Sequence, residues 1–63
     1  MDVGNIVYSI ERSDGTMSVN YHKIKEIIPK AGNCFICDMY DGSSFFNYEL
    51  YTDFEKALDE CLK

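Results

Sequence analysis

The 63-residue chain has no long hydrophobic stretch, and its longest apolar runs, such as residues 6–8 and 34–37, contain only a few residues. A helix needs about 20 apolar residues to cross a bilayer, so these runs do not predict a membrane span. The N-terminal segment MDVGNIVYS carries an aspartate where a secretory signal peptide would carry basic residues. We therefore expect a cytoplasmic protein.

Cysteine is scarce, and the number of cysteines is odd. Small secreted scaffolds usually carry an even number, paired as disulfides, so we expect Cys34, Cys37 and Cys61 to be reduced thiols. Cys34 and Cys37 have the C-x-x-C spacing of zinc and redox sites, which requires both sulfur atoms to converge. A strand would separate them, because residues three apart point to opposite faces. We expect no metal site, including one that adds Cys61 and His22, and no cofactor.

Catalytic motifs are also missing. The chain has no G-x-S-x-G segment and no glycine-rich phosphate loop. The sequence places neither a carboxylate nor a nucleophile beside the single histidine, His22, which we expect at the surface near a strand end. A chain of this length also has little material from which to build a pocket. We expect no enzymatic activity.

The composition, 46% hydrophobic and 27% charged, is that of one folded domain over residues 1–63. Alternating apolar and polar residues predict strands over residues 5–12 and 16–22, joined by an Asp14-Gly15 turn. The same pattern predicts strands over residues 34–40 and 44–51, joined at Asp41-Gly42. Residues 23–29 fit either a strand or a helix, and the β-branched residues before Pro29 favour a strand.

The last twelve residues predict a helix. Thr52 and Glu55 have the spacing of a capping box, in which both side chains satisfy free backbone amides at the helix start. An apolar stripe follows at helical spacing, made of Phe54, Ala57, Leu58, Cys61 and Leu62. We therefore predict an α+β fold, with a small antiparallel meander of four to five strands and one C-terminal amphipathic helix packed on one sheet face.

Aromatic residues mark a candidate partner-binding surface. Alternation assigns Phe46, Tyr48 and Leu50 to the covered face of the sheet and leaves an aromatic set on the other face, namely Tyr40, Phe45 and Tyr51. One interpretation is a docking surface or a homodimer seam, because aromatic residues dominate binding hot spots. The alternative is that these residues shield a thin core.

The net charge of -5 lies entirely in residues 32–63, where seven acids face two lysines. A second candidate set is acidic and lies in the predicted helix region: Asp53, Glu55, Asp59 and Glu60. These carboxylates could meet a basic groove as proteins that imitate nucleic acid do, or could form an ordinary solvated helix face. In size, acidity and lack of a catalytic motif the chain resembles small phage and mobile-element inhibitors, including anti-CRISPR proteins.

Direct nucleic-acid binding is the weaker hypothesis. Four bases precede the acidic half, namely Arg12, Lys23, Lys25 and Lys30, and they could contact phosphates while sheet aromatics stack on bases. The overall negative charge opposes such binding.

A further likeness follows the order of the motifs. The pattern I-x-Y-x-I at residues 6–10, the Asp14-Gly15 turn, the segment V-N-x-x-x-I-x-x-I at residues 19–27, the Asp41-Gly42 turn and the terminal helix are similar to the small flagellar FlbD-type regulators. That resemblance implies a bacterial regulatory or adaptor protein without catalytic residues. The leading hypothesis remains a non-enzymatic acidic module that occupies a surface of a nucleic-acid-handling complex, as an inhibitor would; a homodimerising domain is another alternative.

Overall fold

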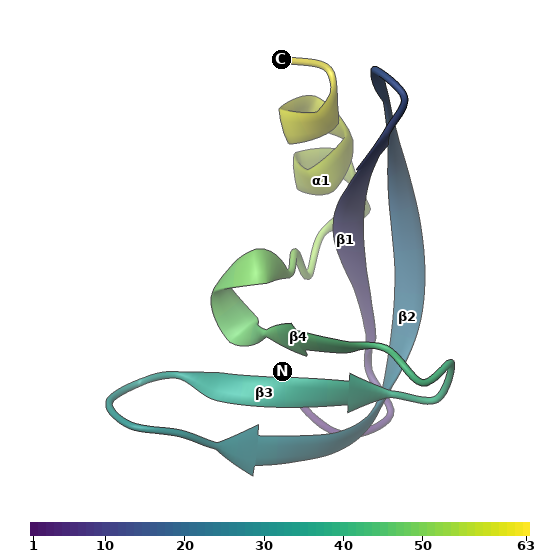
Figure 1. The fold of residues 1–63 in the computed structure, drawn as a ribbon. Coiled ribbons are helices and arrows are strands. Elements are labelled where there is room, and N and C mark those ends of the chain that lie inside the picture. The colour runs from purple at the N-terminus through teal and green to yellow at the C-terminus, as the bar shows by residue number, and fades with distance from the viewer.

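The computed structural model describes all residues from 1 to 63 and contains one antiparallel sheet and one α-helix (Figure 1). Four strands lie in sequence order across the sheet: β1 (Ile6–Ser13), β2 (Thr16–Pro29), β3 (Phe35–Met39) and β4 (Ser44–Phe46). A 3-10 turn, η1 (Asn47–Glu49), and the helix α1 (Phe54–Cys61) follow. The predicted α+β fold with an antiparallel sheet is confirmed. Neither helix has the length and apolar character that a membrane crossing requires.

The first hairpin forms as the Asp-Gly signal indicates. The strands β1 and β2 pair from Ile6 opposite Lys23 to Ser13 opposite Thr16. Asp14 and Gly15 both have positive φ, 50° and 79°, which is the backbone that a tight two-residue hairpin turn requires. Aspartate tolerates this conformation better than most residues and glycine adopts it without strain, so these two residues fix the register of the hairpin.

The strand β2 runs without interruption through the segment that the sequence left ambiguous. Residues 23–29 are a strand, but they continue residues 16–22, so the sheet has four strands. The register shifts between Ile24 and Glu26, which leaves Lys25 unpaired in a bulge. Because the bulge resets the alternation, Ile24 and Ile27 both reach the core. The bulge therefore explains why these two isoleucines have helix-like spacing although they lie in a strand.

The predicted strand over residues 44–51 is wrong in its second half. The strand β4 ends at Phe46, and η1 then turns the chain back toward β1. The Tyr8 and Tyr51 backbones exchange two hydrogen bonds there, with N···O distances of 2.8 and 2.9 Å. This bridge brings the end of the chain to the free edge of β1, and the sheet is curled (Figure 1).

The core lies inside the curl and is small, as expected for a chain of this length. Its buried members come from four different segments: Val7, Ile24, Cys37, Met39 and Leu50. Three half-buried residues, Ile27, Phe35 and Phe45, pack against them. Leu50 reaches the core because the Tyr8–Tyr51 bridge holds the adjacent backbone in place.

The helix α1 begins at Phe54, and its N-cap differs from the prediction. Asp53 is the capping residue, and its Oδ1 atom accepts a hydrogen bond from the Glu55 amide at 3.0 Å. Thr52 lies one position too early for this role. The helix lies beside β1 and β2 (Figure 1). Its Ala57 is buried, and the Phe54 ring lies edge-on to Tyr8 with centroids 5.5 Å apart. Much of Phe54, Leu58 and Leu62 stays exposed.

Candidate functional site

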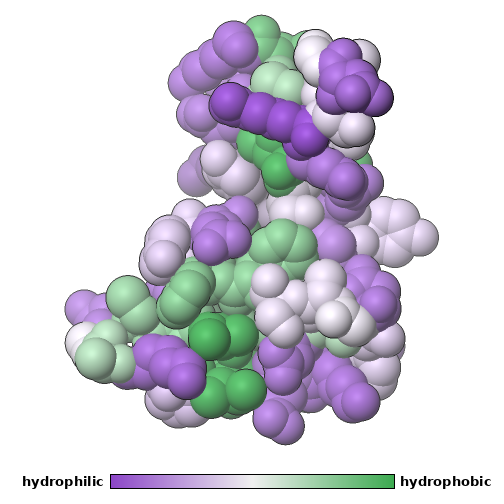
Figure 2. All heavy atoms as spheres, in the orientation of Figure 1, coloured by the Kyte–Doolittle hydropathy of each residue, from purple (hydrophilic) through white to green (hydrophobic).

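An apolar row lies on the sheet face that points away from the core. Ile28 pairs with Ile36, and Ile36 pairs with Phe46, so three neighbouring strands each contribute one side chain. The Phe46 ring stacks on Tyr48 with centroids 5.2 Å apart, and Tyr48 is 68% exposed. We call these four residues the outer patch. In Figure 2 apolar atoms gather over the end of the molecule where β3 and β4 lie.

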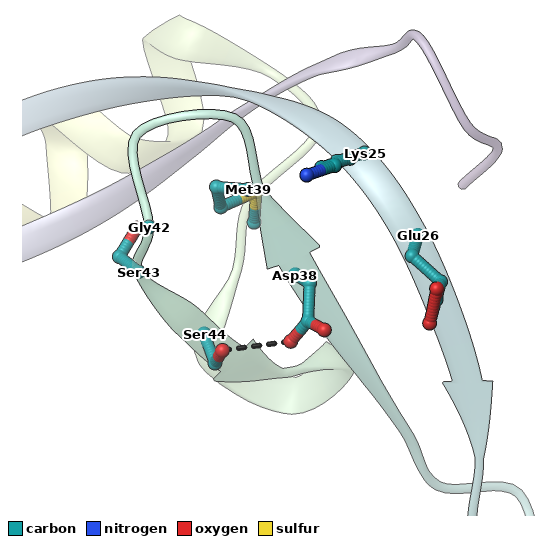
Figure 3. A pocket seen from close by; sticks show the side chains of 7 residues that line it. All are labelled: Lys25, Glu26, Asp38, Met39, Gly42, Ser43 and Ser44. Atoms are coloured by element: carbon teal, nitrogen blue, oxygen red, sulfur yellow. Dashed lines mark hydrogen bonds between the residues drawn. The ribbon is translucent and has the colours of Figure 1, made fainter.

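Two hollows adjoin the outer patch and share Ser44. The first, of about 210 Å³, lies between Ile36, Phe46 and Glu49. The second, of about 270 Å³, is polar and lies between the β2 bulge and the start of β4 (Figure 3). Lys25 and Glu26 project from β2 there, while the Asp38 carboxylate points toward Ser44 and accepts its hydroxyl hydrogen bond at 2.7 Å.

The electrostatics of this face suit a basic, partly apolar ligand. Glu26 and Glu49 are exposed at the surface, and Asp38 is half-buried beside them. Isoleucine and aromatic side chains offer contact area, and carboxylates at the edge attract lysine and arginine. Lys25 is the cation within the polar hollow. The arrangement can therefore bind an apolar side chain and one or two cationic groups at the same time.

The predicted aromatic set does not form one surface. Phe45 was expected on the outward face, and this is wrong, because it pairs with Cys37 and packs on the core. The Asp38–Ser44 pairing after the Tyr40–Ser43 turn fixes this register, so Phe46 faces outward instead. Tyr40 is exposed and its ring centroid lies 5.8 Å from Lys23 Nζ. Tyr51 is half-buried in the bridge to Tyr8.

The predicted acidic set lies together on α1 and its cap. Asp53 caps the helix, while Glu55, Asp59 and Glu60 are exposed. Lys63 Nζ donates a hydrogen bond to Glu60 Oε1 at 3.0 Å, so these two residues form an ion pair. The helix and the strands β3 and β4 lie at opposite ends of the molecule (Figure 1), so these acids do not border the outer patch. They form a second, separate region of negative charge.

The prediction for His22 is wrong, because the folded chain gives it both a carboxylate and a hydroxyl partner. Its side chain is only 9% exposed. Its Nε2 atom lies 2.7 Å from Ser9 Oγ, and its Nδ1 atom lies 2.7 Å from Asp41 Oδ2. Val7 pairs with His22, which puts Ser9 and His22 on the same face of the first hairpin. That diagonal placement could have been inferred from the predicted register.

Asp41 could not have been inferred, since it reaches His22 through the curl of the sheet. The Tyr40 amide donates to the Lys23 carbonyl at 3.1 Å and holds the second hairpin turn beside His22. Hydrogen bonds from the Ser43 hydroxyl and amide, and then from His22, lower the pKa of Asp41 from 3.8 to about 2. Asp41 is thus ionised at neutral pH and accepts only, so His22 Nδ1 carries a proton and neutral His22 accepts the Ser9 hydroxyl at Nε2.

The three cysteines are free thiols in different environments. Cys37 is buried in the core, and this burial raises the pKa of its thiol. Cys34 is half-buried just before β3, and Cys61 is half-buried on α1. No three His, Cys, Asp or Glu side chains lie close enough together to hold a metal ion. Of the C-x-x-C segment, Cys37 packs in the core, whereas Cys34 lies just outside the strand.

Comparison of the chain with protein-family models, with curated proteins and with solved structures gives no significant match. The similarity to FlbD-type regulators and to small mobile-element inhibitors thus rests on the sequence patterns described above.

Proposed function

We propose that this chain is a small acidic protein-binding module whose outer patch docks on a basic surface of a larger protein that handles nucleic acid. Binding of this kind needs no catalytic group. Such a module acts by occupying the surface, as an inhibitor does, and it works in the cytoplasm, where its three free thiols stay reduced. The observation that carries the proposal is the apolar row from Ile28 through Ile36 to Phe46 on the outward sheet face.

Three properties of this face support a protein partner. The row crosses three strands whose backbones are paired, so it is held rigidly and loses little conformational entropy on binding. Tyr48 extends the row as an exposed aromatic residue, the type most enriched at binding hot spots. Glu26, Asp38 and Glu49 lie beside the row, and the chain has a net charge of -5, so the partner surface is expected to be basic.

A bacterial regulatory or adaptor role is the second candidate, favoured by the pattern shared with FlbD-type regulators. It differs in the partner rather than in the mode of action, because it also requires a protein-binding surface. The acids of α1, namely Asp53, Glu55, Asp59 and Glu60, offer the other available surface for either role.

The test is quantitative binding to a purified partner, obtained by affinity capture with the wild-type chain and reconstituted in isothermal titration calorimetry. We expect Tyr48→Ala to weaken binding at least tenfold, since a hot-spot aromatic contributes about 1–2 kcal/mol or more. Tyr21→Ala is the matched control, because Tyr21 is 75% exposed on the first hairpin, away from the patch. We expect this control to bind like the wild type.

Charge reversal distinguishes the two acidic regions. We expect Glu49→Lys to weaken the complex and to flatten its salt dependence, whereas Asp59→Lys with Glu60→Lys should change the affinity far less. The reverse ranking would place the interface on α1 and contradict the outer patch. Unchanged affinity of both Tyr48→Ala and Glu49→Lys would also contradict it. So would concentration-dependent self-association through the patch in analytical ultracentrifugation, since the occupant would then be a second copy of this chain.

A further inference from the structure

Three polar side chains form a hydrogen-bonded series that the binding proposal does not use. Ser9 Oγ lies 2.7 Å from His22 Nε2, and His22 Nδ1 lies 2.7 Å from Asp41 Oδ2. These side chains come from β1, β2 and the turn after β3, so the tertiary fold alone assembles them. The order of hydroxyl, imidazole and carboxylate, with both contacts at hydrogen-bond distance, is the arrangement that activates a serine nucleophile.

We propose that Ser9 is a nucleophile that takes up the acyl group of a small activated carboxylic ester, with His22 as its general base. The Asp41 carboxylate requires the proton of neutral His22 on Nδ1, which leaves the Nε2 lone pair facing the Ser9 hydroxyl. Asp41 is therefore the positioning residue that holds the productive tautomer. This inference does not depend on the outer patch, which lies on the other face of the sheet.

A hollow of about 340 Å³ gives access to the hydroxyl. Ser9, His22 and Asn20 line it together. Ser9 is only 5% exposed, so a reagent must enter this hollow to reach the oxygen. The Asn20 amide donates one hydrogen to Glu11 Oε2 at 2.6 Å and has a second hydrogen left for the carbonyl oxygen of a bound acyl group. The fitting substrate class is a short-chain acyl ester with a good leaving group.

The step is an ordinary acyl transfer. A bond forms between Ser9 Oγ and the carbonyl carbon while the hydroxyl proton moves to His22 Nε2. The bond from that carbon to the leaving oxygen then breaks, and the leaving oxygen takes the proton from Nε2. Water repeats the same sequence on the acyl-serine, which releases the carboxylic acid and restores the Ser9 hydroxyl.

The experiment is acylation of the folded wild-type chain by p-nitrophenyl acetate, followed by intact mass spectrometry and peptide mapping. We expect a single acetyl adduct on Ser9, because Ser9 lines the hollow together with its general base. We expect Ser9→Ala to form no adduct in this peptide and His22→Gln to react about a hundredfold more slowly, the usual worth of a general base. Ser18→Ala, an exposed serine on β2, is the matched control and should react like the wild type.

A measurement on the unmodified chain keeps the proposal testable if a variant does not fold. The ¹⁵N chemical shifts of His22 should show the proton on Nδ1 in the neutral form, and Asp41→Asn should reverse this preference while circular dichroism shows that the fold is kept. A proton on Nε2 in the wild type would overturn the proposal. So would an adduct on a lysine or on another serine in place of Ser9, or a folded wild-type chain that neither carries an adduct nor releases p-nitrophenolate faster than Ser9→Ala does.

Discussion

Asp41 makes the stability of this fold depend on pH. It accepts two hydrogen bonds from Ser43, at 2.5 and 2.9 Å, and a third contact from His22 at 2.7 Å. These donors favour the carboxylate over the carboxylic acid, and they lower its pKa to about 2. Asp41 thereby joins the β3–β4 turn to the histidine of β2. The charged form of this one side chain stabilises contacts between segments that lie far apart in the sequence.

The lowered pKa sets the direction of a pH effect on stability. In the unfolded chain Asp41 titrates near its ordinary pKa of 3.8, and in the folded chain near 2. Its contribution is therefore complete above pH 4 and is lost as the pH falls toward 2. We expect the free energy of unfolding of Asp41→Asn to lie below that of the wild type at pH 7, with the difference closing between pH 4 and pH 2.

Urea denaturation at several pH values measures this difference. Asp14→Asn is the matched control, because Asp14 occupies the other hairpin turn, is exposed and makes no side-chain hydrogen bond. A constant gap between the wild type and Asp41→Asn from pH 7 to pH 2 would show that the Ser43 and His22 contacts do not depend on the charge of Asp41.

At the level of the elements, the start of α1 depends on a single side chain. The Asp53 carboxylate accepts from the Glu55 amide, and an acidic cap also interacts favourably with the positive end of the helix dipole. Thr52 belongs to the segment that leads from the Tyr8–Tyr51 bridge into the helix, and its hydroxyl makes no hydrogen bond to the helix start. Because Asp53 and not Thr52 is the cap, the helix begins at Phe54.

Substitution of the two residues separates these roles. We expect Asp53→Ala to lower the free energy of unfolding by about 1 kcal/mol, which is typical for the loss of an N-cap, and Asp53→Asn to restore most of it. Thr52→Ala should change it by less than about 0.5 kcal/mol, as expected for an exposed residue. Thermal and urea unfolding followed by circular dichroism measure all three variants. A larger loss for Thr52→Ala than for Asp53→Ala would assign the cap to Thr52.

The elements also show which parts of the fold the sequence could reveal. The two Asp-Gly turns, the alternation before Gly15 and the apolar spacing after Thr52 are local signals, and the hairpins and the helix follow from them. The bulge at Lys25 is not local, because it is defined by where β3 pairs with β2. The outward face of Phe46 depends on the turn register and on η1, so the alternation of residues 44–51 gave the wrong side for Phe45.

The same distinction applies to the candidate sites. Acidic residues of α1 were found because a helix places its own charges, while the outer patch needs the register of three strands. The Ser9–His22 contact lies within one hairpin, but Asp41 joins it from 19 residues further along the chain. Local sequence patterns therefore predict where surface charge lies. They do not predict the contacts between polar side chains that the curl of the sheet creates.

For the whole molecule, the bridge between Tyr8 and Tyr51 closes the sheet. It pairs with the edge of β1 at Tyr8 and holds the backbone next to Leu50, so it joins the last third of the chain to the first strand. Native-state hydrogen exchange tests this closure. We expect the Tyr51 amide to exchange slowly, like amides within β1, whereas the adjacent Thr52 amide, which has no backbone partner, should exchange rapidly.

Equal, rapid exchange at Tyr51 and Thr52 would show that the sheet is open at this edge. A hydrophobic core drawn from β1, β2, β3 and the segment after η1 would then lose Leu50 as a member. Under that outcome Leu50→Ala would cost far less than the 2–5 kcal/mol typical of a buried leucine, which provides an independent check.

The continuity of β2 has a consequence for how this protein can be divided. One strand of fourteen residues serves both hairpins, with its first part paired to β1 and its last part paired to β3. A cut between Lys23 and Ile24 would leave each hairpin its paired residues but would divide the one core, whose members come from β1, β2, β3 and the segment after η1. We therefore expect residues 1–63 to fold only as a whole, so a graft or duplication must include all of them. Cleavage in the exposed loop around Gly32 would yield two pieces that fold only when they recombine.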